Sequence, residues 1–225
     1  MNEAPENLTP FTYVFPSGIS ADAAGAASLQ WADAGGAFGR SLPLKFGPGV
    51  ASVQGISNAF TREECAQIVA MGEARPRNDG RVELGPDAYR VSHIAWLTPE
   101  PANHWLFHRL AVLFAQANRH YGFDLTGFVE PLQYTRYDSN QHFDWHLDLG
   151  GDQTSARKLS MSLQLSGPDE YEGGRLEFSS LVPGEEARRV GTAVFFPSYL
   201  AHRVHPVQSG VRRSLVAWAY GPAFR

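Results

Sequence analysis

The second half of the chain alternates apolar and polar residues in short stretches that turn residues interrupt. This pattern predicts eight strands, at 128–137, 141–147, 157–166, 174–180, 187–190, 192–196, 202–207 and 211–220. No helical spacing is visible between them. Many short strands in succession favour a jelly roll or a barrel, so we expect a mainly β domain with flanking helices.

Two helices are expected before these strands. Thr61-Arg-Glu-Glu64 has the form of a capping box, which predicts a helix over 62–73, and Pro76 follows its end. A second helix is expected from about 102 to 121, where apolar residues recur at helical spacing and Gly122 can end it. Both helices are expected to brace the sheet.

The remaining segments are less regular. Residues 1–50 are rich in Ala and Gly and are interpreted as an N-terminal arm or cap, followed by a domain over 51–225 whose jelly-roll core starts near 128. Turn-forming residues fill 75–88, which predicts a mobile loop, and residues 89–97 read as a strand. We expect 75–88 to close over an active site as a lid, with an ordinary solvated loop as the alternative.

Composition narrows the class of protein. A length of 225 residues suits one domain, and no apolar stretch approaches the roughly 20 residues that cross a bilayer. A net charge of -4 and a pI near 6.0 provide no overall basic field, so a nucleic-acid partner is not expected. The single cysteine excludes an internal disulfide and a cysteine-based zinc site. An acidic N-terminus without a signal-peptide pattern predicts a cytoplasmic protein.

Histidine and aspartate occur at metal-ligand spacing. Residues two apart on a strand point the same way, so His-x-Asp can offer two ligands to one ion. The chain contains two such pairs, His142/Asp144 and His146/Asp148, and alternation alone places all four side chains on one face. A distal third ligand could be His202 or His205, which differ in parity and so face opposite sides of a regular strand. Two imidazoles and one carboxylate are the set that a reactive Fe(II) site uses.

Several motifs in this region resemble the prolyl 4-hydroxylase-like branch of the 2-oxoglutarate/Fe(II)-dependent oxygenases. They are Tyr134-Thr-Arg-Tyr-Asp-Ser-Asn-Gln-His-Phe-Asp-Trp-His-Leu-Asp148, Arg157 to Ser166, Glu172-Gly-Gly-Arg-Leu-Glu-Phe178, Gly191 to Pro197, His202-Arg-Val-His-Pro-Val207 and Gly210 to Trp218. The resemblance covers about 128–220 and implies a double-stranded β-helix, or jelly-roll, core supported by N-terminal helices.

The resemblance also chooses among the candidate ligands. The family carries a tyrosine nine or ten residues before the first ligand, a position that Tyr137 occupies relative to His146. Ten residues after the distal ligand it carries a basic residue, which is Arg212 counted from His202. The implied metal ligands are therefore His146, Asp148 and His202.

The same resemblance implies a cosubstrate site. Arg212 would bind the distal carboxylate of 2-oxoglutarate, because a guanidinium donates two parallel hydrogen bonds to a carboxylate. Tyr137 would line this pocket. Gln164 stands where relatives often carry a tyrosine, and a glutamine can still donate a hydrogen bond there. Arg213 is expected on the opposite face.

The function expected from this resemblance is that of a dioxygenase. It would use Fe(II), 2-oxoglutarate and O2, with ascorbate as a stimulant, to hydroxylate a C–H bond of a peptide or protein residue, an amino acid or a small metabolite, and release succinate and CO2. A non-catalytic jelly-roll module and a cupin-like metalloenzyme that does not use 2-oxoglutarate are the alternatives. The sequence does not choose the substrate or the oligomeric state.

Overall fold

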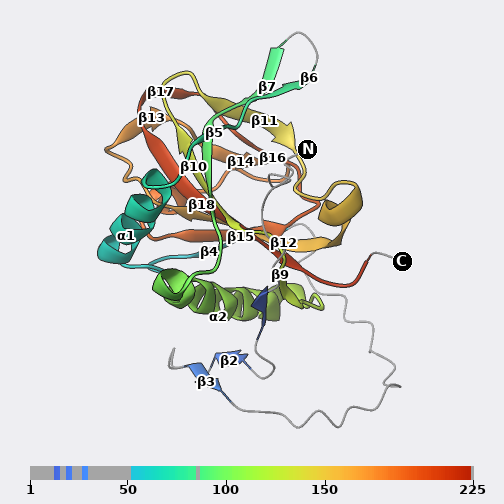
Figure 1. Cartoon of the computed structure of the whole chain (residues 1–225). Coiled ribbons are helices and arrows are strands. Elements are labelled where there is room, and N and C mark those ends of the chain that lie inside the picture. The colour runs from blue at the N-terminus through green and yellow to red at the C-terminus, as the bar shows by residue number, and fades with distance from the viewer. Residues whose placement is uncertain (1–12, 16–18, 22–26, 30–51, 85–86, 224–225) are drawn as a thin grey trace.

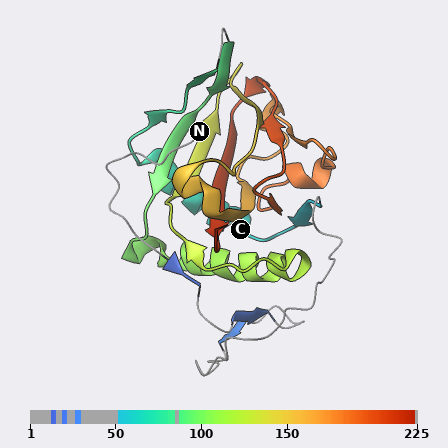
Figure 2. The ribbon, with the colours of Figure 1, turned by 90° about the vertical axis from the view of Figure 1, so that its right-hand side faces the viewer.

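Two β-sheets face each other, and a helical layer covers the outer side of the larger sheet (Figures 1 and 2). The structure is a computed structural model that describes residues 13–15, 19–21, 27–29, 52–84 and 87–223. Polar side chains from both sheets line the space between them.

The larger sheet has nine strands among the described residues, all in antiparallel pairs. Its main path runs in the order β4 (Gln54–Ile56), β15 (Ala193–Pro197), β12 (Arg157–Gln164), β18 (Arg212–Tyr220), β10 (Leu132–Tyr137), β8 (His93–Leu97) and β5 (Asn78–Asp79). Two further strands, β9 (Gly127–Phe128) and β1 (Tyr13–Val14), extend it from β18.

The smaller sheet has five described strands, in the order β14 (Leu176–Phe178), β16 (His202–Val204), β11 (His142–His146), β7 (Asp87–Val91) and β6 (Val82–Leu84). Two-stranded ribbons are formed by β13 (Tyr171–Gly173) with β17 (Val207–Gly210), and by β2 (Ile19–Ala21) with β3 (Ala27–Leu29). This pair of facing antiparallel sheets is the expected jelly-roll core.

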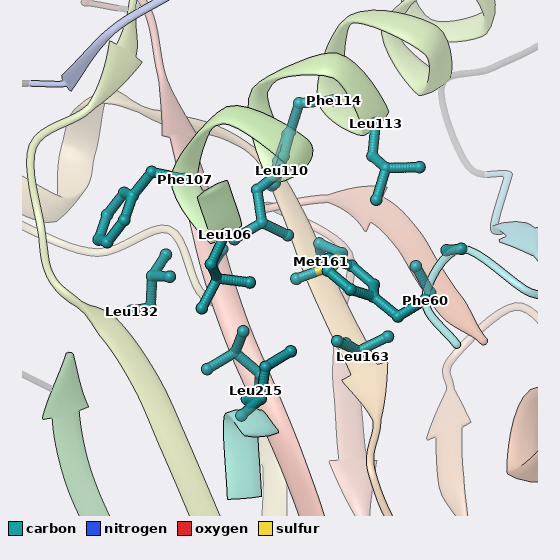
Figure 3. Close-up of a cluster of buried hydrophobic side chains, with 14 of the residues drawn as sticks. Phe60, Leu106, Phe107, Leu110, Leu113, Phe114, Leu132, Met161, Leu163 and Leu215 are labelled. Carbon is teal, nitrogen blue, oxygen red and sulfur yellow. The ribbon is translucent and has the colours of Figure 1, made fainter. Parts of the chain in front are cut away.

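The helices α1 (Arg62–Glu73) and α2 (His104–Tyr121) support the larger sheet, with a short 3-10 turn (Pro101–Asn103) leading into α2. Figure 3 shows leucine and phenylalanine side chains of α2 directed at Met161, Leu163 and Leu215 on β12 and β18. On these strands the alternate residues point into the space between the sheets. The larger sheet therefore presents apolar side chains to the helices. Its inner face can carry polar side chains.

The helix predictions are confirmed. Thr61 Oγ1 accepts from the amide of Glu64 at 3.1 Å, and Glu64 Oε2 accepts from the amide of Thr61 at 2.8 Å, as a capping box requires. Helix α2 ends at Tyr121, and Gly122 follows in the left-handed conformation with φ 70°. Local capping residues therefore determine the start of α1 and the end of α2.

Several strand predictions are wrong in detail. Residues 89–97 are two strands, β7 and β8, which belong to different sheets and part at the buried Ser92. The predicted strand 202–207 likewise divides into β16 and β17 at residues 205–206. Residues 185–188 form a 3-10 turn (Glu185–Arg188) where a strand was predicted over 187–190, because Gly184 starts a turn there. Tyr171–Gly173 is a strand that the alternation did not reveal.

The expected loop over 75–88 includes β5, β6 and the start of β7, so it is not irregular. Figure 1 shows β6 and β7 as a hairpin that projects beyond the other strands of the smaller sheet. Its action as a lid stays a prediction.

Most of the expected N-terminal arm, 1–50, lies outside the described residues. One described piece is integrated into the domain: β1 pairs with β9, and the Phe15 ring meets the Phe128 ring edge-on at 4.8 Å. Within the described residues, no helix is long and apolar enough to cross a membrane. The division at residue 50 stays a prediction.

Candidate metal centre

A β-bulge in β11 determines which side chains enter the space between the sheets. The register with β16 shifts between Phe143, which pairs with Val204, and His146, which pairs with His202. An extra residue reverses the alternation, so two residues three apart point the same way. The Phe143 and His146 rings are accordingly stacked, with centroids 3.4 Å apart and 10° between their planes.

His146, Asp148 and His202 come together at this point. His146 ends β11, Asp148 follows two residues later, and His202 starts the paired strand β16. His146 Nε2 lies 4.0 Å from Asp148 Oδ1, and His202 Nε2 lies 3.8 Å from Asp148 Oδ2. All three ligand atoms lie within 4.8 Å of one another, and the side chains are almost completely buried. One ion can therefore reach all three.

The backbone holds both imidazoles with Nε2 available to a metal. His146 Nδ1 donates to the carbonyl oxygen of Asp144 at 2.7 Å, and His202 Nδ1 donates to that of Leu200 at 3.0 Å. A proton on Nδ1 leaves the lone pair of a neutral ring on Nε2, which is the usual arrangement of metal-binding histidines. Asp148 Oδ2 is buried and has no hydrogen-bond partner in the described residues. Its environment suits a cation.

The charge states of these groups also favour a cation. Burial and the neighbouring His202 lower the pKa of His146 to about 3, so this imidazole is neutral at physiological pH. Burial alone would raise the pKa of Asp148, but His202, His146 and Arg157 outweigh it and hold that pKa below its ordinary value. A neutral imidazole and an ionised carboxylate are the forms that bind metal.

The competing candidates lie elsewhere. Asp144 is exposed, and its Oδ1 accepts from the amide of Trp145 at 2.8 Å. His205 Nε2 is hydrogen-bonded to Glu177 at 2.5 Å. His142 Nδ1 lies 3.4 Å from the carbonyl of Asn140, before the bulge. The structure brings none of these three side chains into the cluster formed by His146, Asp148 and His202.

A buried ion pair supports the Asp148 backbone, and the sequence analysis did not find it. Arg157 Nε donates to Glu130 Oε1 at 2.7 Å, and its Nη1 donates to the carbonyl oxygen of Asp148 at 3.0 Å. The guanidinium also lies 3.9 Å from the centroid of the Trp218 ring. The available signal was the charged Arg157 at the start of the alternating strand β12. Such outer contacts orient metal ligands.

Arg90 is a second buried cation that was missed. Its side chain is fully buried, its Nε donates to Ser92 Oγ at 2.8 Å, and its guanidinium lies 4.7 Å from the centroid of the Phe143 ring. Burial lowers the pKa of Arg90, while a hydrogen bond to Tyr137 and the charge of Asp148 oppose this shift. It adds positive charge beside the metal ligands.

Arg212 and Tyr137 lie opposite each other on paired strands, and both line one cavity together with the three metal-ligand candidates. The Arg212 guanidinium lies 5.6 Å from the centroid of the Tyr137 ring. The Arg212 side chain is buried, and no hydrogen bond or ion pair of its guanidinium occurs within the described residues. A buried cation without an anion is costly, so this position suits an anionic ligand.

Gln164 uses its hydrogen-bond donors within the protein. Its Nε2 donates to the carbonyl of Ser166 at 2.9 Å and to the hydroxyl of Tyr171 at 3.1 Å, which occupies both of its donors. Tyr171 comes from β13, the strand that alternation did not reveal, and lines a cavity together with Gln164 and Arg212. The hydroxyl hydrogen of Tyr171 is therefore better placed to meet a ligand beside Arg212.

Sequence comparisons agree with this arrangement. The family model of the 2OG-Fe(II) oxygenase superfamily matches residues 132–220. A PKHD-type hydroxylase of Xylella fastidiosa (strain M12) is 31% identical over 176 residues, which span 72% of this chain and 76% of that relative. The chain belongs to the 2OG-Fe(II) oxygenase superfamily. This oxygenase is a hydroxylase that uses Fe(II) and 2-oxoglutarate.

Solved structures show the same fold. A prolyl-4-hydroxylase from Pseudomonas putida is 20% identical, with a TM-score of 0.62 over 76% of this oxygenase and 93% of that chain. A second structure is a prolyl hydroxylase from Trichoplax adhaerens in complex with a peptide fragment of the hypoxia inducible factor oxygen degradation domain. It is 17% identical, with a TM-score of 0.60 over 76% of this oxygenase and 84% of that chain. The oxygenase therefore shares the fold of these prolyl hydroxylases.

Proposed function

We propose that His146, Asp148 and His202 hold the Fe(II) ion of this oxygenase. The observation that carries the proposal is the buried, unpartnered Oδ2 of Asp148 between two imidazoles whose Nδ1 atoms are fixed by backbone carbonyls. Two neutral nitrogens and one carboxylate oxygen leave open positions on Fe(II) for a cosubstrate and dioxygen. When bound, the ion supplies the oxidising chemistry that hydroxylates a C–H bond.

Arg212 would bind the distal carboxylate of 2-oxoglutarate. It lines the same cavity as the metal ligands and has no protein anion beside it within the described residues. Tyr171 would donate a second hydrogen bond to this carboxylate, in the role expected of Gln164, and Gln164 would orient the Tyr171 hydroxyl. Tyr137 and Arg90 would close the side of the pocket. Buried arginines around the cavity favour a dianionic cosubstrate.

The substrate would be a residue of a peptide or protein. The curated relative is named a hydroxylase, and the solved prolyl hydroxylase from Trichoplax adhaerens holds a peptide fragment. In such a reaction the cavity walls exclude water from the reacting groups, and the fixed imidazoles hold the ion in one orientation. The protein side chains themselves need not donate or accept a proton.

The experiment is an anaerobic titration with Fe(II) and 2-oxoglutarate, which should produce a visible charge-transfer band in the natural protein. His146→Ala, Asp148→Ala and His202→Ala should each abolish it, and His142→Ala and His205→Ala, as matched controls, should retain it. Absence of the band in the natural protein, or its loss only in the control variants, would contradict the assignment. Release of succinate in air then separates a hydroxylase from a binding module or from an enzyme that does not use 2-oxoglutarate.

A further inference from the structure

A second cavity adjoins the one that contains the metal-ligand candidates. The two cavities share Ser162, Leu176 and Arg212 in their walls. Arg175 and Arg188 also line the second cavity, whereas no aspartate or glutamate among the described residues does so. Arginines without a carboxylate around one cavity concentrate positive potential there. This space therefore suits an anionic ligand.

Arg188 ends the 3-10 turn Glu185–Arg188 and is held against β13. Its Nη2 donates to the carbonyl oxygen of Tyr171 at 3.3 Å, and its guanidinium lies 4.9 Å from the centroid of the Tyr171 ring. Its Nε is buried and has no hydrogen-bond partner in the described residues. A buried charged donor that stays unpaired is costly. Arg188 therefore offers a positioned N–H group to a ligand.

Glu185, an acidic neighbour of these arginines, lies at the surface. Its side chain is 70% exposed, with Oε2 3.9 Å from Arg188 Nη1 and Oε1 3.3 Å from Arg175 Nη2. Water and salt screen such exposed pairs, which contribute little. The Arg175 side chain is itself 47% exposed, against 20% for Arg188. Arg188 is therefore the better placed of the two to meet an anion inside the cavity.

Tyr171 connects Arg188 with the site proposed for the distal carboxylate of 2-oxoglutarate. Arg188 lies over the Tyr171 ring, whose hydroxyl is the proposed second donor to that carboxylate. A Cβ atom at Gly174 would lie 3.1 Å from both Arg212 Cδ and Tyr171 Cε2, so these two side chains pack around one glycine. A carboxylate has about four lone-pair sites, of which the Arg212 fork would take two and the Tyr171 hydroxyl one. One site is left for Arg188.

We propose that Arg188 is a second cation for the distal carboxylate of 2-oxoglutarate, which it binds through Nε beside Arg212. This rests on the metal and cosubstrate assignment given above. Two guanidinium groups on one carboxylate make the affinity depend on the distal charge more strongly than Arg212 alone does. Arg188 thereby helps to select a 2-oxo dicarboxylate over a 2-oxo monocarboxylate.

The test compares 2-oxoglutarate with 2-oxopentanoate, in which a methyl group replaces the distal carboxylate. Both acids chelate Fe(II) through the same two groups, so anaerobic titration of the charge-transfer band measures both affinities without turnover. Arg188→Gln should weaken 2-oxoglutarate binding about 10- to 100-fold, the effect of losing one charge-assisted hydrogen bond, and leave 2-oxopentanoate binding unchanged. Arg188→Lys keeps the charge and should recover part of the loss. Arg189→Gln, at an exposed arginine paired with Glu186, is the matched control and should bind both acids as the natural protein does.

A second background separates direct contact from an effect through Tyr171. In Tyr171→Phe, which lacks the hydroxyl, Arg188→Gln should still weaken 2-oxoglutarate binding. No further loss there would make Arg188 a support for Tyr171 and overturn the proposed contact. An equal loss of both acids in Arg188→Gln, or unchanged affinity for 2-oxoglutarate, would also overturn it and leave the metal assignment intact. A natural protein without the band would refute the metal and cosubstrate assignment instead.

Discussion

Arg157 donates a hydrogen bond to the carbonyl oxygen of Asp148 at 3.0 Å while its guanidinium is paired with the buried Glu130. The ion pair thereby ties the segment that carries the carboxylate ligand to β12. Because two charges are removed from water here, the pair contributes little net stability unless its hydrogen bonds offset the cost of desolvation. We expect it to contribute instead to the position of Asp148.

Arg157→Lys should weaken Fe(II) binding about 10- to 100-fold, the usual effect of losing an outer contact of a metal ligand. A lysine keeps the charge opposite Glu130 but has no planar fork that can serve Glu130 and Asp148 together. Anaerobic competition with a metal-binding dye measures the affinity. Arg189→Lys, at an exposed arginine paired with Glu186, is the control. Equal affinity in both variants would mean that Arg157 has no role in placing Asp148.

Arg212→Ala should raise the 2-oxoglutarate concentration needed for half-maximal turnover about 100-fold or more, because charge-assisted hydrogen bonds to a carboxylate contribute about 1.5–3 kcal/mol each. Metal affinity should change little, since Arg212 is not a ligand. Arg213→Ala is the matched control: Arg213 Nε lies 3.4 Å from Glu73 Oε1, away from the cavity. A similar rise in both variants would move the carboxylate site elsewhere.

The sequence predicted the ligands only with the help of a family resemblance. Alternation on a regular strand left His142/Asp144 and His146/Asp148 equivalent, whereas the register shift between Phe143 and His146 makes them different. A bulge depends on pairing with β16, which lies about 60 residues away in the chain. Local pattern cannot contain that information. The helices, whose caps are local, were predicted to the residue for α1 and within two residues for α2.

The cosubstrate pocket illustrates the same limit. Gln164 was read as a possible donor to the cosubstrate, but Ser166 and Tyr171 occupy its two N–H groups. Tyr171 was missed because β13 has three residues and pairs only with β17. Short ribbons of this kind leave little periodicity to detect.

Gly72→Ala should destabilise the protein although alanine is the better helix former. A Cβ atom at position 72 would lie 2.3 Å from Cγ of the Tyr134 ring, whose hydroxyl is bound to Glu73 and cannot easily withdraw. Overpacking costs about 1–3 kcal/mol, and helix propensity returns up to about 1 kcal/mol. Urea unfolding should show a net loss. Gly151→Ala, where no atom lies within 4 Å, should be nearly neutral. A stabilised Gly72→Ala variant would show that α1 can move away from β10.

Cys65 should resist thiol reagents in the native protein. This single cysteine is buried in α1, and burial, with a smaller contribution from Glu64, raises its pKa to about 11. The thiolate is the reactive form, and an unfolded thiol has a pKa near 8.5. Because its pKa is raised, the native thiol continues to deprotonate between pH 9 and 11. The unfolded thiol is already mostly ionised in that range.

Labelling with a chromogenic disulfide at pH 8 should therefore be at least about 100-fold slower in buffer than in 8 M urea, since burial restricts access and the thiolate fraction is lower by more than a factor of ten. The rate in urea should level off above about pH 9, whereas the native rate should continue to rise toward pH 11 if reaction occurs in the folded state. A native rate that levels off with the urea rate would instead show that labelling requires α1 to open. Rapid labelling at pH 8 in buffer would contradict the burial of Cys65 and the packing of α1 on the larger sheet.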